Sequence, residues 1–313
     1  MTRLGDVSDM LVGFAFKSAG FLDADADGVR ILRGDNVQQG YIRWGDKTKK
    51  WPVAQCDGLE RYQLAEDDVI LAMDRPIVGD GLKMAWIRPE DLPALLVQRV
   101  CRLRGKPDMA LTKFIRYVLA APDFSGHIHR ITTGANIPHI SGKDIAAYEF
   151  ELPDLEDQVR IVECLSAYDD LIATNQRRIA LLEDAARRLY REWFVHLRFP
   201  GHESVPVKDG VPEGWERGSL DRALFLQRGF DLPNGSRIAG DVPVYASTGI
   251  NGFHNDAKAV GPGVVTGRSG TLGQVHYVAK DFWPLNTSLW VKEFRRVSSI
   301  AAYFLLSELN LEQ

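Results

Sequence analysis

Apolar and polar positions recur with helical spacing through the middle of the chain. From Leu155 to His196 the sequence contains neither proline nor glycine. One set of residues there keeps a strict 3-4-3-4 spacing over four heptads. This spacing is typical of a coiled-coil seam, whereas a helix lying on a sheet carries a broader apolar stripe. The seam residues are Leu165, Tyr168, Ile172, Asn175, Ile179, Leu182, Ala186, Leu189 and Trp193.

Helix start and stop signals flank this segment. Pro153 precedes it and Pro200-Gly201 follows it. The pattern predicts a helix that begins near Glu156, holds about 40 residues and is about 60 Å long. Asn175 is a polar residue at a seam position, where it fixes the register at some cost in stability. The alternative interpretation is a long bundle helix inside one large domain.

The predicted seam needs a partner helix, because alone it would expose a continuous apolar stripe to water. The chain contains no second uninterrupted heptad stretch. We therefore expect the partner helix to come from a second copy of the chain or from a separate fragment.

The segments on either side of the helix resemble each other. Residues 1–151 and 211–313 both consist of short β-type runs punctuated by Gly and Asp. In the first, the strand-like run 95–103 precedes a helical run at 111–121; in the second, 287–294 precedes 300–309. This pattern indicates a large internal repeat. Aligning the helical runs leaves residues 128–199 without a counterpart, so we expect the second copy to be incomplete.

These patterns predict an α+β fold in which a long coiled-coil helix separates two mixed α/β domains. We expect the first domain at 1–151, the spacer helix at 152–199, a linker at 200–214 and the second domain at 215–313. The second domain should be only marginally stable, because it lacks the segment that returns the chain to the helix. An early end of this kind fits a naturally truncated gene product, a fragment made for expression, or half of a split protein.

Composition places the chain among ordinary globular proteins, with 45% hydrophobic and 26% charged residues. The richest apolar stretch, Ile300–Leu306, is far shorter than the roughly 18 residues of a membrane helix. The three cysteines are widely separated and form no C-x-x-C pair. We therefore expect a cytoplasmic protein with no membrane association. The net charge is −4, and neither flanking segment is strongly basic, with 20 basic against 21 acidic residues in 1–151 and 10 against 9 in 215–313. Arg43–Lys50 and Arg99–Lys106 are local basic clusters.

Enzyme signatures are absent from the sequence. It contains no G-x-x-x-x-G-K-[ST] phosphate loop, no H-E-x-x-H and no G-x-S-x-G elbow. His127 and His129 fit a surface pair better than a metal site. The glycine-rich segment Gly261–Gly273 could cradle a phosphate, but β-type runs flank it, which also fits a hairpin tip presenting Arg268, Ser269 and Thr271.

The central block supplies a resemblance. It contains Glu151-Leu152-Pro153-Asp154-Leu155-Glu156-Asp157-Gln158, then Arg160-Ile161, Leu165, Tyr168-Asp169-Asp170 and Ile172, and later Leu182, Leu189 and Trp193-Phe194-Val195. It resembles the conserved region of specificity subunits of type I restriction–modification systems, in which such a phrase opens a long helix. Asp154 stands where that family usually has a second proline. The flanking segments resemble its two target recognition domains more loosely, Gly267–Gly273 being the better match, and we expect the second domain to be truncated.

This resemblance implies a non-catalytic DNA-recognition subunit. Each target recognition domain would read one half of a bipartite site on double-stranded DNA, with the helix as a spacer. Methyltransferase subunits would bind S-adenosylmethionine and methylate adenine at N6. Restriction subunits would cut unmodified DNA with ATP and Mg. No cofactor is expected on this chain itself.

Candidate DNA contacts follow from residue chemistry and position, because arginine, lysine and small polar side chains contact phosphates and base edges. We expect Trp193 and Phe194 to pack against a domain or partner instead. One alternative is a coiled-coil adaptor whose flanking domains bind protein; another is an enzyme that uses Gly267–Gly273 for a nucleotide. The candidate DNA contacts are Arg43, Lys47, Lys49, Arg75, Lys83, Arg130, Thr133 and Asn136 in the first domain, and Arg228, Arg268, Ser269 and Thr271 in the second.

Overall fold

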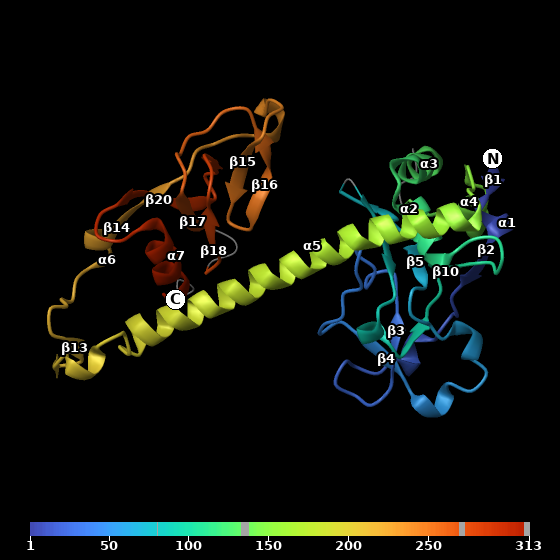
Figure 1. Cartoon of the computed structure of the whole chain (residues 1–313), viewed down its shortest axis with the longest axis horizontal. Coiled ribbons are helices and arrows are strands. Elements are labelled where there is room, and N and C mark those ends of the chain that lie inside the picture. The colour runs from blue at the N-terminus through green and yellow to red at the C-terminus, as the bar shows by residue number, and fades with distance from the viewer. Residues whose placement is uncertain (80, 133–137, 269–272, 310–313) are drawn as a thin grey trace. The chain divides into compact units, whose positions relative to one another are not determined.

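The computed structural model of the chain divides into two compact units, unit 1 (Met1–Asn175) and unit 2 (Gln176–Gln313). It describes all residues except 80, 133–137, 269–272 and 310–313. The boundary between the units falls inside the long helix α5 (Leu155–Tyr190), drawn in yellow-green in Figure 1. The predicted α+β fold with a long helix is confirmed, whereas the predicted domain boundaries stay predictions.

A four-stranded antiparallel sheet forms the centre of unit 1. Its strand order is β2 (Ser8–Val12), β10 (Val100–Gly105), β5 (Val69–Ala72), β8 (Met84–Trp86). All four residues of β5 are buried, and they alternate between two hydrophobic clusters. This period of two is the one that a strand buried on both faces requires.

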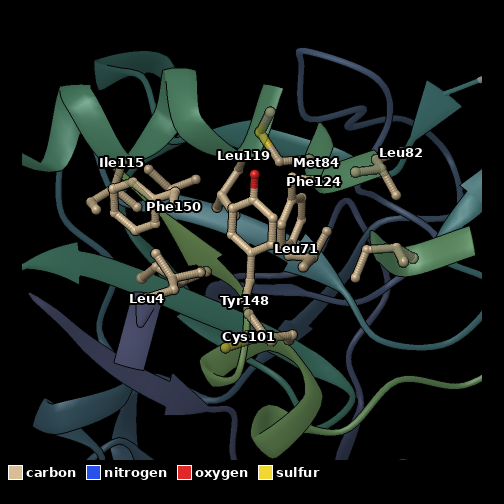
Figure 2. Close-up of a cluster of buried hydrophobic side chains, with 14 of the residues drawn as sticks. Leu4, Leu71, Leu82, Met84, Cys101, Ile115, Leu119, Phe124, Tyr148 and Phe150 are labelled. Atoms are coloured by element: carbon tan, nitrogen blue, oxygen red, sulfur yellow. The ribbon is translucent and has the colours of Figure 1, made fainter. Parts of the chain in front are cut away.

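Helices cover one face of this sheet. Strand residues Leu71 and Leu103 share a cluster with Ile115 of α2 (Thr112–Ala120) and Phe124 of α3 (Pro122–Thr132). Tyr148 lies in the same cluster, with its ring 5.0 Å from that of Phe124, centroid to centroid (Figure 2). The shorter elements of unit 1 are α1 (Leu4–Val7), α4 (Gly142–Ala146), the strand pair β1 (Thr2–Arg3) and β11 (Glu149–Phe150), and the hairpin β6 (Ile77–Val78) and β7 (Gly81–Leu82).

A second, three-stranded sheet covers the other face. Its order is β4 (Lys49–Trp51), β3 (Val29–Leu32), β9 (Ala94–Leu96), with β3 antiparallel to β4 and parallel to β9. Leu32 and Leu96 of this sheet share a buried cluster with Ile70 and Val100 of the first. Unit 1 therefore buries apolar side chains on both faces of its central sheet.

Unit 2 repeats this topology. Its four-stranded sheet runs β14 (Leu224–Arg228), β20 (Ser288–Phe294), β17 (Gly263–Gly267), β18 (Val275–Val278). Its three-stranded sheet runs β16 (Gly249–His254), β15 (Val242–Ala246), β19 (Trp283–Pro284), again with one antiparallel and one parallel pair. The short helix α6 (Leu220–Ala223) precedes β14, and α7 (Ser299–Glu308) follows β20. The predicted internal repeat is therefore present in the fold.

Backbone hydrogen bonds give the register of the repeat. Three bonds of unit 1 recur in unit 2 between residues at the same places in the fold. The bond from Gly13 N–H to Val100 O (3.1 Å) matches that from Gly229 N–H to Ser288 O (3.1 Å). The bond from Phe14 N–H to Leu96 O (3.0 Å) matches that from Phe230 N–H to Pro284 O (2.8 Å). The bond from Met73 N–H to Arg99 O (2.9 Å) matches that from Arg268 N–H to Thr287 O (3.0 Å). By this register Arg268 corresponds to Met73, and Asn286 corresponds to Gln98.

Gly13 and Gly229 occupy the same position in the two units, where the backbone passes against a neighbouring carbonyl. A Cβ added at Gly13 would lie 2.3 Å from Val97 O. We expect Gly13→Ala to destabilise unit 1 by about 1–3 kcal/mol, since the backbone must move to relieve the overlap. Urea unfolding measures this loss. Gly45→Ala is the control, because a Cβ there meets no atom within 4 Å and should leave the transition nearly unchanged.

The three cysteines differ in their surroundings. Burial raises the pKa of Cys101 to about 12, despite the opposing charge of Arg102, whereas the Cys164 side chain is exposed on α5. A buried neutral thiol is a poor nucleophile. We expect a thiol reagent at pH 8 to modify Cys164 rapidly and Cys101 only on unfolding, as peptide mass mapping would show. Rapid labelling of Cys101 in the folded chain would contradict the packing of β10.

The predicted long helix is confirmed. α5 spans 36 residues and continues into a π-helical turn at Arg191–Val195. Most of the predicted seam side chains on it are exposed, Tyr168 to 63% and Leu182 to 70%, while Ala186 and Trp193 are half-buried. Phe194 packs near Trp215, with 5.9 Å between ring centroids. The helices of the described residues include none that is long and apolar enough to cross a membrane.

The predicted linker at 200–214 contains a β-hairpin. β12 (Val207–Lys208) and β13 (Val211–Pro212) pair antiparallel across Asp209 and Gly210, whose φ angles are 52° and 72°. Two positive φ angles are what a type I′ hairpin turn requires, and Asp-Gly is a favoured sequence for it. The Asp209-Gly210 dipeptide is the sequence signal for this hairpin, which the interpretation of 200–214 as a linker does not include.

Candidate nucleic-acid interface

A polar cleft of about 650 Å³ lies on unit 1 where several turns between strands meet. The turns that follow β3 and β5, the residue before β8 and the turn between β9 and β10 each contribute charged or polar side chains. The basic and acidic lining residues are Arg33, Asp35, Asp74, Arg75, Lys83 and Arg99, and the other lining residues include Phe16, Phe21 and Gln98. Four cationic and two acidic side chains leave the cleft positively charged. A cleft of this sign attracts phosphate groups.

Asp74 organises one side of the cleft. Its Oδ2 accepts a hydrogen bond from Arg99 Nη1 at 2.8 Å, and its Oδ1 lies 2.5 Å from His139 Nδ1. Burial raises the pKa of Asp74, but the hydrogen bonds and charges of His139 and Arg99 outweigh it and lower that pKa overall. The ionised carboxylate therefore holds Arg99 at the rim. The backbone N–H of Arg75 donates to Pro138 O at 2.8 Å, which holds the neighbouring turn in place.

Two of the cleft arginines have unusual backbone conformations. Arg75 has a φ of 45° and Arg99 a φ of 66°, both in the left-handed region that non-glycine residues rarely occupy. Such conformations cost of order 1–3 kcal/mol each and cluster at binding and active sites. Both side chains are exposed. The turns therefore keep two cationic side chains at the surface of the cleft despite the strain.

Lys83 lies deeper in the cleft and is half-buried. Burial is the main cause that lowers its pKa; Asp35 and Asp74 oppose the shift, while Arg75 and Arg43 add to it. An anion bound in the cleft would favour the charged ammonium group, since it would offset the neighbouring arginines. The structure thus brings together in the cleft Arg75 and Lys83, two of the residues predicted from sequence, and a third, Arg43, is close enough for its charge to act on Lys83.

The other predicted residues of unit 1 have different surroundings. Lys47 is exposed, and its carbonyl accepts from Arg33 Nη2 at 3.0 Å, beside the cleft. Lys49 lies on β4 and is paired with Asp23. Arg130 is exposed on α3. Thr133 and Asn136 lie outside the described residues.

Sequence reasoning missed Arg33, Gln98 and Arg99 as lining residues. Arg99 belongs to the basic cluster Arg99–Lys106, but that cluster divides in the structure. Arg102 of β10 pairs with Asp9 of β2 at 2.8 Å, and Arg104 of β10 pairs with Asp68, which directly precedes β5. Both arginines therefore join neighbouring strands of the sheet and do not line the cleft. Only the strand order, which brings the turns after β3, β5 and β9 together, identifies Arg99 as a cleft residue.

In unit 2 the predicted contacts lie at the ends of strands. Arg228 is the exposed last residue of β14, and Arg268 follows β17 directly. The Arg268 side chain is exposed, and its Nη1 donates to Asn286 O at 3.2 Å. β17, which lies within the glycine-rich segment Gly261–Gly273, pairs antiparallel with β18, which follows that segment, as the hairpin interpretation predicts. Ser269 and Thr271 fall in the part of the chain that the structure does not describe.

Metal-ligating side chains do not gather in the described residues: no group of three or more His, Cys, Asp or Glu side chains there could hold a metal ion. The polar side chains of the cleft are four cations, one amide, one hydroxyl and two carboxylates, which suit hydrogen bonding to phosphates and base edges.

Comparison with known proteins places the chain in a family. The family model of the type I restriction modification DNA specificity domain matches residues 1–184. The type I restriction enzyme EcoAI specificity subunit of Escherichia coli is 36% identical over 174 residues, which cover 55% of this chain and 28% of that protein. The MjaVIII specificity subunit of Methanocaldococcus jannaschii is 29% identical over 189 residues, which cover 60% of this chain and 44% of that protein. The matched regions thus span less than half the length of these relatives.

The fold also has a solved counterpart. The crystal structure of a type I restriction–modification system S subunit from M. genitalium matches 97% of this chain and 75% of that chain, with a TM-score of 0.51 and 15% sequence identity. At this identity the likeness concerns the fold alone. The family match covers unit 1 and reaches into the second half of α5. The chain therefore belongs to the type I restriction–modification DNA specificity family.

Proposed function

We propose that this chain is a sequence-specific DNA-recognition subunit without a catalytic centre of its own. The observation that carries the proposal is the positively charged cleft of unit 1, built on strained turns inside the domain that the family model matches. Arginine and lysine bind the DNA backbone with counterion release, and arginine and glutamine also read base edges in the major groove. Unit 2 repeats the fold and would read the second half of a bipartite site.

The chemistry would belong to partner subunits. Relatives of the chain are named as specificity subunits of type I restriction enzymes, which supports partnership with methyltransferase and restriction subunits. Methyltransferase subunits would carry S-adenosylmethionine for adenine N6 methylation, and restriction subunits would use ATP with Mg to cut unmodified DNA. We place this assembly in the cytoplasm, where the host DNA lies.

A second helix packed along α5 would cover its exposed seam. The exposed seam fits an antiparallel partner helix from a second copy of the chain or from a separate fragment. In such an antiparallel pair, the seam residues of one helix would pack between the seam residues of the other. Two identical copies would recognise a palindromic arrangement of half-sites.

Selection from a pool of random DNA duplexes tests the proposal with the purified chain alone. We expect enrichment of a defined sequence, and an affinity that falls steeply as salt rises because phosphate contacts release counterions. Absence of salt-dependent DNA retention would favour the coiled-coil adaptor, whose flanking domains bind protein.

A further inference from the structure

A buried glutamine fastens the start of α5 to unit 1. Gln158 is fully buried, and its side-chain amide makes three hydrogen bonds to the backbone of unit 1. Nε2 donates to Met109 O at 3.0 Å and to Pro153 O at 2.9 Å, while Oε1 accepts from Leu111 N–H at 2.9 Å. Both amide protons are therefore used. Few other side chains could satisfy these three backbone groups, which would be costly to leave unpaired once buried.

A second attachment lies three turns further along the helix. Asp169 Oδ2 accepts from the Tyr117 hydroxyl at 2.8 Å and also pairs with Arg116. The Tyr117 hydroxyl lies 3.1 Å from Ser166 Oγ. The Arg116 guanidinium is itself held over the Trp86 ring, 3.5 Å from its centroid. Contacts within unit 1, between α2 and β8, therefore hold the Arg116 side chain in position to pair with Asp169.

The attachment points lie on one face of α5. Between Gln158 and Asp169, Val162 packs against the main core of unit 1. Positions 158, 162, 166 and 169 follow each other at intervals of four, four and three, so their side chains lie along one side of a helix. The two ends of this docked face are about 16 Å apart along the axis. Two points so far apart fix the direction of a rod, whereas one alone leaves it free to pivot.

We propose that Gln158 and Asp169 are positioning residues that fix the direction in which α5 leaves unit 1, and thereby the number of base pairs between the two half-sites. The inference rests on the proposed function. A tilt of about 20° about Gln158 would move Thr174, about 24 Å along the helix, by roughly 8 Å. That displacement exceeds the roughly 3.4 Å between successive base pairs, so loss of the second attachment should relax the spacing that the protein accepts.

Spin labels test the attachment without any DNA. In the full chain carrying Cys56→Ser and Cys164→Ser, nitroxides at Glu66→Cys and Thr174→Cys report the distance between unit 1 and the helix, with unlabelled chain added to suppress intermolecular signals. We expect one narrow distance distribution, which Asp169→Ala broadens or shifts by roughly 8 Å. Asp170→Ala, at the exposed neighbouring position, is the matched control and should leave it unchanged. An equally narrow, unshifted distribution in Asp169→Ala would overturn the proposal.

Site spacing supplies the readout that simple destabilisation would not move. The chain is combined with its methyltransferase subunit and a duplex library in which only the number of base pairs between the half-sites varies. We expect Asp169→Ala to methylate sites with at least one additional spacing while both half-site sequences stay the same, and the control to keep a single spacing. Unchanged spacing in Asp169→Ala contradicts the positioning role. Absence of methylation by the unsubstituted chain counts against the proposed function instead, and the spin-label result then decides the attachment alone.

Discussion

Replacing Arg75 and Lys83 together with alanine is expected to weaken DNA binding about 100-fold at low salt, at roughly 1.4 kcal/mol for each lost charged contact. The two side chains line the same cleft, and neither lies in the hydrophobic core. If both contact phosphates, the slope of log affinity against log salt should also fall by about two. Titration of a labelled duplex over a range of salt concentrations measures both quantities.

Arg3→Ala is the control for this pair. Arg3 is an exposed cation on unit 1 that pairs with Glu149 at 3.2 Å and does not line the cleft. An exposed ion pair contributes little to stability, so this variant should fold and bind DNA as the unsubstituted chain does. Equal loss of affinity in the control would mean that binding follows the overall charge of the chain rather than the cleft.

Leu182→Asp is expected to abolish self-association through α5. Leu182 is 70% exposed, so the substitution should leave the separate chain folded. In the antiparallel pair its side chain would be buried against the seam of the other helix, where an unpaired carboxylate costs several kcal/mol. Sedimentation velocity over a range of concentrations should show a dimer for the unsubstituted chain and a monomer for the variant.

Leu181→Asp is a closely matched control, because it makes the same chemical change one residue away. Leu181 is 59% exposed and lies outside the predicted seam. This variant should still form dimers. If both variants dimerise as the unsubstituted chain does, the seam is not the contact; if the unsubstituted chain is monomeric at all concentrations, the partner helix comes from another chain.

The long helix and the internal repeat could be predicted because their signals are local. A heptad that runs from Leu165 to Trp193 without proline or glycine specifies a helix from short-range spacing alone. The repeat appears as matched runs of strand and helix, such as 95–121 and 287–309. The hydrogen-bond register then aligns Gly13 with Gly229, where the same close approach to a carbonyl recurs.

The cleft could be predicted only in part, since it depends on strand order. β3 and β9 pair in parallel although about 60 residues separate them, and their turns meet the turn after β5 only in the folded sheet. Residue chemistry and position therefore led to Arg75 and Lys83 but not to Arg33. The same limit applies to Gln158, because its position inside a family phrase gives no indication that three backbone groups surround it.

Mapping methyl transfer tests the central claim most directly. The chain is mixed with its methyltransferase subunit, S-adenosylmethionine and a library of duplexes, and the modified adenines are located by sequencing. We predict methylation confined to one bipartite sequence, or to a palindromic one if two copies pair through α5, and its loss in the Arg75→Ala, Lys83→Ala variant. Methylation without sequence preference, or none although the two subunits form a complex, would contradict a role in DNA recognition.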